Sequence, residues 1–325
     1  SSHQPDGLMT RLMGENMMRK DGDAHMAERR ALFPALSPRT VATHWKPVFE
    51  AATARIIADL APRGACDLVT EFAMPVSAAA LVAITGLSQM SYAEMDRVSQ
   101  HMLDGVANYT GDPDIEGRCH AATSLIDMHI TRMMHNAPAK SALAVMQAAG
   151  LPEASIRANI KLVISGGQNE PRDVISGTVW ALLSHPEQLA LIRNGTQTWG
   201  DAFGEYVRWN SPIGMSPRII AQADAIGGVD FEVGARVFLM FSSASRDEAH
   251  FEMPARFDIT RNTNAAIPFG AGPHFCAGAA ASRCLITEIA LPMLFAALPD
   301  LRLTGPAPFS GWAFRGPVSV PVAWG

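Results

Sequence analysis

The chain has 325 residues, of which 48% are hydrophobic and 18% are charged, and its formal net charge is −5. It is long and apolar enough for a large folded core, so a disordered protein is excluded. The small negative charge gives no basis for a general affinity for nucleic acid or for an anionic membrane.

Neither a leader nor a membrane span is predicted. Residues 1–10 are polar and have no signal-peptide core, and the clearest apolar stretch, residues 289–298, contains Pro292 and is too short to cross a bilayer. The four cysteines form no CxxC pair, so structural disulfides are not expected. We therefore expect a cytoplasmic protein.

Apolar residues at helical spacing fill the first two-thirds of the chain. Ser91 and Glu94 form a capping box, and Pro186 stands where proline is tolerated in a first helical turn. On these signals we expect helices over residues 41–60, 91–108, 114–135 and 152–183, and a further helix from residue 185.

The pattern changes after Asn210, where short strand candidates, a Gly-Gly turn and a Pro- and Gly-rich tail appear. No repeat or linker divides the chain, so we expect one mainly α-helical domain with small β-sheets over residues 1–325. Its later part is expected to contain strands over 218–222 and 236–241 around Gly227-Gly228, an irregular stretch over 242–273, a helix over 276–298 and β-hairpins over 301–325.

Cys276 lies in a loop whose backbone is fixed by three glycines and a proline, and Ala279 begins a strong helix directly after it. A cysteine just before a helix is close to the positive end of the helix dipole, where backbone N–H groups can point at its sulfur. Both effects favour the thiolate, which is the form that binds metals. Taken alone, such a residue would be read as a buried structural cysteine.

The loop reads F-x-x-G-x-H-x-C-x-G, with Phe269, Gly272, His274, Cys276 and Gly278 at the defining positions. This pattern resembles the haem-binding loop of the cytochrome P450 family. The resemblance implies that Cys276 is the axial ligand of the iron in haem b. It also implies that Phe269 packs against the thiolate side of the haem and that His274 reaches a haem propionate.

A second matching segment is the E-x-x-R of Glu205 and Arg208, whose spacing places an acid and a base on one helix face. In the family an arginine from the later irregular stretch completes a buried ionic network with this pair. The matching residue in this chain is Arg256, in the segment Pro-Ala-Arg-Phe-Asp.

Further matches concern the haem propionates. His25 and Arg29 resemble the family's H-x-x-x-R helix, and Arg218 matches another propionate-binding arginine. Without the cysteine loop each would be read as a surface charge. The resemblance runs from His25 to the C-terminus. It implies a fold truncated at its N-terminal side, because the family's N-terminal sheet strands, first helices and pocket-covering loop have no counterpart.

The predicted long helix carries Gly166-Gly167-Gln168-Asn169-Glu170-Pro171 where the family usually has A/G-G-x-D/E-T. Asn169 therefore takes the position of the acid and Glu170 that of the alcohol, as in some bacterial members of the family, including ones that act on aromatic ethers. Pro171 has no N–H for the Gly167 carbonyl, so a kink is expected there. The notch would suit water or dioxygen, unless the kink is purely structural.

Glu170, Asn169 and Gly167 are accordingly the candidate catalytic residues, with Glu170 as a proton donor whose pKa is raised by burial. The alternative is that Glu170 turns away and pairs with Arg172, Arg208 or solvent. By resemblance, the substrate pocket is expected to be mainly apolar and to suit a small apolar or aromatic substrate. Its expected lining is Val163, Gly166, Ile213, Met215, Ser216 and Phe314, with Trp312 and Ala313 as further candidates.

The resemblance predicts a monooxygenase that inserts one oxygen atom from O2 into its substrate, by hydroxylation or O-dealkylation. The chain shows no G-x-G-x-x-G fingerprint and no cysteine set for an iron–sulfur cluster, so electrons are expected from a ferredoxin or a flavin reductase, separate or fused. Two alternatives stay open: a peroxygenase driven by hydrogen peroxide, and a non-catalytic haem protein that binds a gas. Neither nucleic acid nor membrane is an expected partner.

Overall fold

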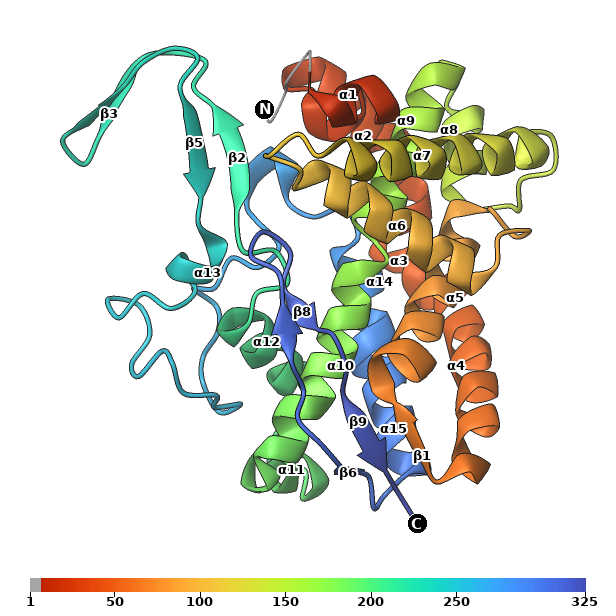
Figure 1. The fold of residues 1–325 in the computed structure, drawn as a ribbon, viewed down its shortest axis with the longest axis vertical. Helices are drawn as coiled ribbons and strands as arrows, with labels where there is room; N and C mark the ends of the chain where they lie inside the picture. The colour runs from red at the N-terminus through yellow and green to blue at the C-terminus, as the bar shows by residue number, and fades with distance from the viewer. Residues whose placement is uncertain (1–6) are drawn as a thin grey trace.

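The structure is a computed structural model that describes residues 7–325, so the first six residues of the expected polar start lie outside the described residues. It is mainly helical with small sheets, as the sequence predicts (Figure 1). The α-helices are α1 Leu8–Met13, α2 Gly22–Leu36, α3 Pro38–Thr40, α4 Lys46–Leu60, α5 Met74–Thr85, α6 Tyr92–Val106, α7 Pro113–Met133, α8 Ala142–Ala148, α9 Glu153–Ser165, α10 Asn169–Ser184, α11 Pro186–Arg193, α12 Trp199–Trp209, α13 Phe241–Ala244, α14 Ala279–Arg283 and α15 Leu291–Ala297.

Local signals in the sequence fix several of these helices. The capping box at the start of α6 is present, because the Ser91 side chain accepts from the Glu94 N–H and the Glu94 side chain accepts from the Ser91 N–H. The helix expected over 41–60 is present as α4 preceded by a π-helical turn over Val41–Trp45. Pro186 begins α11, as expected.

The single helix expected over residues 152–183 is wrong. The chain breaks at residues 166–168 and forms two helices, α9 and α10. Pro171 falls in the first turn of α10, where a missing N–H costs nothing. A Cβ on Gly167 would lie 2.5 Å from the Val163 carbonyl oxygen and 2.9 Å from Leu81 Cδ1. The expected kink is therefore a complete break, and only glycine fits at its centre.

Within residues 7–325 the strands form four small antiparallel sheets. The expected strands after Asn210 are present but shorter, and the Gly227-Gly228 turn joins a separate hairpin between them. The strands are β1 Ala65–Asp67, β2 Ser216–Ile219, β3 Asp224–Ile226, β4 Val229–Phe231, β5 Arg236–Leu239, β6 Arg302–Leu303, β7 Phe309–Ser310, β8 Gly316–Pro317 and β9 Pro321–Ala323, with β2 paired to β5, β3 to β4, β7 to β8, and β9 between β1 and β6.

Helix α10 runs through the middle of the molecule, with α5, α12 and α15 around it and α6 across its upper end (Figure 1). Ala279–Ala297 is apolar and long enough to cross a membrane by length and composition, which corrects the expectation that no stretch is. Ile286, Ile289 and Leu291 of this segment are fully buried in the core. It lies beside α10 as a core helix of the fold.

Candidate functional site

The loop that carries Cys276 is held by its own backbone. Gly270 and Gly272 have positive φ angles of 68° and 67°, which explains the glycines. The Cys276 N–H donates to the Phe269 carbonyl at 3.0 Å, and the Phe275 N–H donates to the Gly272 carbonyl at 3.0 Å. Helix α14 begins three residues after Cys276. The sulfur is therefore placed at the start of a helix on a closed turn.

The Cys276 thiol differs from the other cysteines in its surroundings. The pKa of the Cys276 thiol is raised overall, chiefly by burial, while the backbone N–H groups of Gly278 and Ala279 and the charge of Arg29 act in the opposite direction. Burial also raises the pKa of Cys66, Cys119 and Cys284, to about 12, 11 and 11. Of the four thiols, only that of Cys276 is given backbone N–H donors by the described residues, and such donors stabilise a thiolate.

Cationic side chains gather beside this loop. The rings of His25 and His274 are stacked, with their centroids 4.1 Å apart. Arg29 donates to the Phe275 carbonyl at 2.6 Å. Asp21 lies 3.0 Å from His274 Nε2, and its charge also acts on His25 and Arg218. The structure thus brings together the four residues expected to bind propionates, and it adds Asp21, which the sequence did not indicate.

These groups suit haem b. One thiol that receives backbone N–H donors provides the single protein ligand that a thiolate-bound haem iron needs. Four cationic or potentially cationic side chains on one side of it match a group that carries two carboxylates. Phe269 adds an apolar surface, with the Arg283 guanidinium 4.9 Å from its ring centroid and the Phe203 ring 6.1 Å away.

Glu205 and Arg208 form a fully buried pair, with Arg208 Nε and Nη2 2.6 and 2.8 Å from the two carboxylate oxygens of Glu205. The second guanidinium on Glu205 belongs to Arg261, at 3.3 Å, and not to Arg256 as expected. Arg256 contributes only its backbone carbonyl, which accepts from Arg208 at 3.2 Å. A turn in which the Arg256 N–H donates to the Met253 carbonyl leaves the Arg256 side chain exposed.

The first turn of α10 presents its polar residues on two sides. Asn169 donates to Gln100 of α6 at 2.7 Å, so its amide is directed at α6. Within the described chain, both carboxylate oxygens of Glu170 are buried and have no hydrogen-bond partner. The alternative partners of Glu170 are occupied, because Arg172 binds Asp96 and Asp173 while Arg208 binds Glu205. Glu170 therefore faces a small cavity with Val174, Phe203 and Phe269.

Burial raises the pKa of Glu170 to about 7, and the charge of Asp173 adds to this effect while Arg172 opposes it. A carboxyl group with a pKa near neutrality can both hold and release a proton at physiological pH. The charge of Glu170 also acts on Cys276, so the two groups lie in one electrostatic environment.

The residues expected to line the substrate pocket do not line the cavity at Glu170, and their place in a substrate pocket stays a prediction. Ile213 and Phe314 pair through an isolated β-bridge, and Ser216 Oγ accepts from Arg218 at 2.6 Å. Met215 is buried, and Val163 and Gly166 lie at the end of α9. The Ala313 carbonyl accepts from the Gly214 N–H at 2.8 Å, and the neighbouring Trp312 is 61% exposed.

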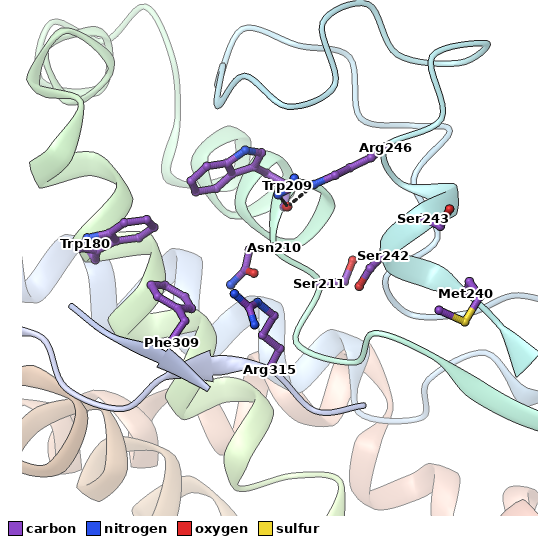
Figure 2. A pocket seen from close by; sticks show the side chains of 10 residues that line it. All are labelled: Trp180, Trp209, Asn210, Ser211, Met240, Ser242, Ser243, Arg246, Phe309 and Arg315. Carbon is purple, nitrogen blue, oxygen red and sulfur yellow. Dashed lines mark hydrogen bonds between the residues drawn. The ribbon is translucent and has the colours of Figure 1, made fainter. Parts of the chain in front are cut away.

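A cavity of about 660 Å³ lies elsewhere (Figure 2). It is an open cleft between the C-terminal halves of α10 and α12, α13 and the β7–β8 hairpin, and none of the residues of the Cys276 loop line it. Trp180, Trp209 and Phe309 form its aromatic side, and Arg246 crosses it to reach the Trp209 carbonyl. The cleft is thus separate from the site at Cys276.

Comparisons with known proteins agree on one family. The sequence profile described as Cytochrome P450 matches residues 202–293. The chain is 30% identical over 320 residues to "Cytochrome P450 107B1" of Saccharopolyspora erythraea, covering 95% of this chain and 77% of that protein. It is 28% identical over 297 residues to "6-deoxyerythronolide B hydroxylase" of the same organism, covering 89% and 72%.

Solved structures share the fold. P450BioI, solved in complex with a fatty-acid-ligated acyl carrier protein, superposes with a TM-score of 0.90 at 22% identity, covering 100% of this chain and 86% of that one. CYP154A1 from Streptomyces coelicolor gives a TM-score of 0.88 at 27% identity, covering 97% and 82%. The fold predicted from the cysteine loop is therefore confirmed.

Proposed function

The chain belongs to the cytochrome P450 family, and we propose that it inserts one oxygen atom from O2 into a small apolar or aromatic substrate, by hydroxylation or O-dealkylation. Membership of the family carries with it haem b as cofactor and the activity of a haem monooxygenase. The substrate class, the electron donor and the roles of individual residues are what the proposal adds.

The observation that carries the proposal is the environment of Cys276. The Cys276 sulfur would hold the iron, since the N–H groups of Gly278 and Ala279 favour its thiolate. His25, Arg29, His274 and Arg218 would hold the two carboxylates, with Phe269 against the thiolate side. Haem b, when bound, supplies the activation of dioxygen, and a thiolate ligand favours cleavage of the O–O bond.

Glu170 is the proposed proton donor. Its carboxyl group is buried without a partner in the described chain and has a pKa of about 7, so it can hold a proton at neutral pH. Asn169, the first residue of α10, would hold this turn against α6 and would not act as an acid, because its amide donates to Gln100 of α6.

The partner is proposed to be a ferredoxin or a flavin reductase, separate or fused, in the cytoplasm. Nucleic acid and membrane are not proposed as partners. The relatives bear names as different as 6-deoxyerythronolide B hydroxylase and steroid C26-monooxygenase. The proposed substrate class therefore rests on the apolar residues of this chain.

A peroxygenase is the second candidate, because an acid at Glu170 could also protonate added hydrogen peroxide. Three arms separate the possibilities: turnover with reductase and O2, turnover with hydrogen peroxide alone, and no turnover. The first supports the monooxygenase, the second the peroxygenase, and the third a haem protein that only binds a gas. Titrating a panel of aromatic ethers, fatty acids and macrolides and recording the iron spin state tests the substrate class; a shift only with large polar compounds would contradict it.

A further inference from the structure

The turn that carries Glu170 has little support from its own backbone. It follows the break at residues 166–168, and no side chain caps the N-terminus of α10. The first N–H groups of a helix have no acceptor within the helix, and Pro171 has no N–H at all, so few backbone hydrogen bonds hold this turn. Because the two oxygens of Glu170 have no partner in the described chain, they do not fix its position either. Some other contact must place this turn.

Helix α6 supplies such contacts on the opposite side of the turn. Asp96 Oδ1 accepts from Gln168 Nε2 at 3.0 Å and from Arg172 Nη1 at 3.0 Å, and Gln100 accepts from Asn169 at 2.7 Å. Asp96 and Gln100 are one helical turn apart, and so are Gln168 and Arg172, so two short polar rows face each other. We call these residues the α6–α10 seam.

Arg172 extends the seam to the C-terminal hairpin. Its Nε donates to Asp173 Oδ1 at 2.9 Å, and the side chain is only 14% exposed. A Cβ on Gly316 of β8 would lie 2.3 Å from Asp173 Cγ, so β8 packs directly on this carboxylate. One guanidinium therefore joins carboxylates that contact two different elements, and removing it would leave the nearly buried Asp173 and the partly buried Asp96 without this cation.

We propose that Arg172 is a positioning residue: it clamps the first turn of α10 between α6 and β8 and thereby sets the place of the Glu170 carboxyl group. The inference rests on the proposed function of Glu170. Arg172 makes no hydrogen bond to Glu170 within the described residues, and its Nη1 and Nε donate to Asp96 and Asp173. It acts through the backbone of the turn.

The test compares Arg172→Met and the milder Asp96→Asn with Arg157→Met in the holoprotein. Arg157 joins α9 to Asp127 of α7 and to Glu153, so it is a partly buried bridging arginine away from the turn. Hydrogen exchange is measured over residues 92–106 and 168–174. The clamp predicts that amide exchange there rises about tenfold in Arg172→Met and less in Asp96→Asn, and is unchanged in Arg157→Met. Equal exchange in all three variants would overturn it.

A double-mutant cycle tests the link to Glu170. Product formed per electron consumed, measured against pH, should fall in Arg172→Met as it falls in Glu170→Gln, and the double variant should be no worse than the lower single variant. Substrate affinity, read from the spin-state titration, should stay within about twofold. If the losses of the two single variants multiply in the double variant, or if only substrate affinity falls, Arg172 does not position Glu170. If Glu170→Gln alone is like wild type, the proposed function of Glu170 fails, and the exchange data still decide whether the clamp exists.

Discussion

Replacing Glu205 with alanine removes the acceptor at the centre of the buried ionic network. Glu205 is fully buried and accepts from Nε and Nη2 of Arg208, from the Arg261 guanidinium at 3.3 Å and from the Asp258 N–H at 2.9 Å. The variant keeps the Arg208 charge buried with only carbonyl acceptors. Breaking such a pair typically costs about 3–5 kcal/mol, a large part of the roughly 5–15 kcal/mol by which domains are stable. We expect little folded holoprotein.

The assay is urea unfolding together with haem content per chain, and Glu288→Ala is the matched control. Glu288 forms an exposed ion pair with Lys46 at 2.7 Å, and exposed pairs are worth about 0–1 kcal/mol. Arg261→Met should destabilise clearly, whereas Arg256→Ala should stay within about 0.5 kcal/mol because its side chain is exposed. If Glu205→Ala loses no more stability than Glu288→Ala, or if Arg256→Ala is the more harmful arginine variant, the reasoning is refuted.

Two further predictions concern the helix break and Glu170. Gly167→Ala should destabilise the protein by about 1–3 kcal/mol, because the new Cβ would clash with Val163 and Leu81. Gly117→Ala is the control and should be neutral or stabilising, because Gly117 has open space around it. Equal urea midpoints for the two variants would contradict this prediction. The pKa of Glu170 is raised from 4.5 to about 7, so its contribution to stability is present at low pH and is lost as pH rises from about 4.5 and passes 7. Between pH 4.5 and 8 the free energy of unfolding of wild type should therefore fall by on the order of 3 kcal/mol relative to that of Glu170→Gln. A difference between the two proteins that does not change with pH would contradict the burial of this carboxyl group.

The cysteine loop and the capping box could be predicted because their signals are local. The backbone has positive φ at residues 270 and 272, where glycine is favoured, and Ser91 and Glu94 of the capping box are only three residues apart. Neither signal depends on the rest of the fold. Both the fold class and the ligand loop followed from such short patterns.

The misses have long-range causes. The helical pattern continues through residues 166–168, and nothing in it shows that Val163 and Leu81 leave no room for a side chain at Gly167. Strand β1 was missed because its partner, β9, lies more than 250 residues away in the chain. Arg261 replaced Arg256 because a turn decides which arginine reaches Glu205. Asp21 was missed because only the folded chain brings it to His274.

The most direct test of the account is the absorption spectrum of the reduced carbon monoxide complex of the holoprotein and its cysteine variants. Wild type should show the red-shifted Soret band of thiolate-bound haem, and Cys284→Ser, in the helical segment that follows the loop, should keep it. Cys276→His should abolish the band even where haem still binds. A band that persists in Cys276→His, or that disappears on substitution of Cys66, Cys119 or Cys284, would contradict Cys276 as the iron ligand.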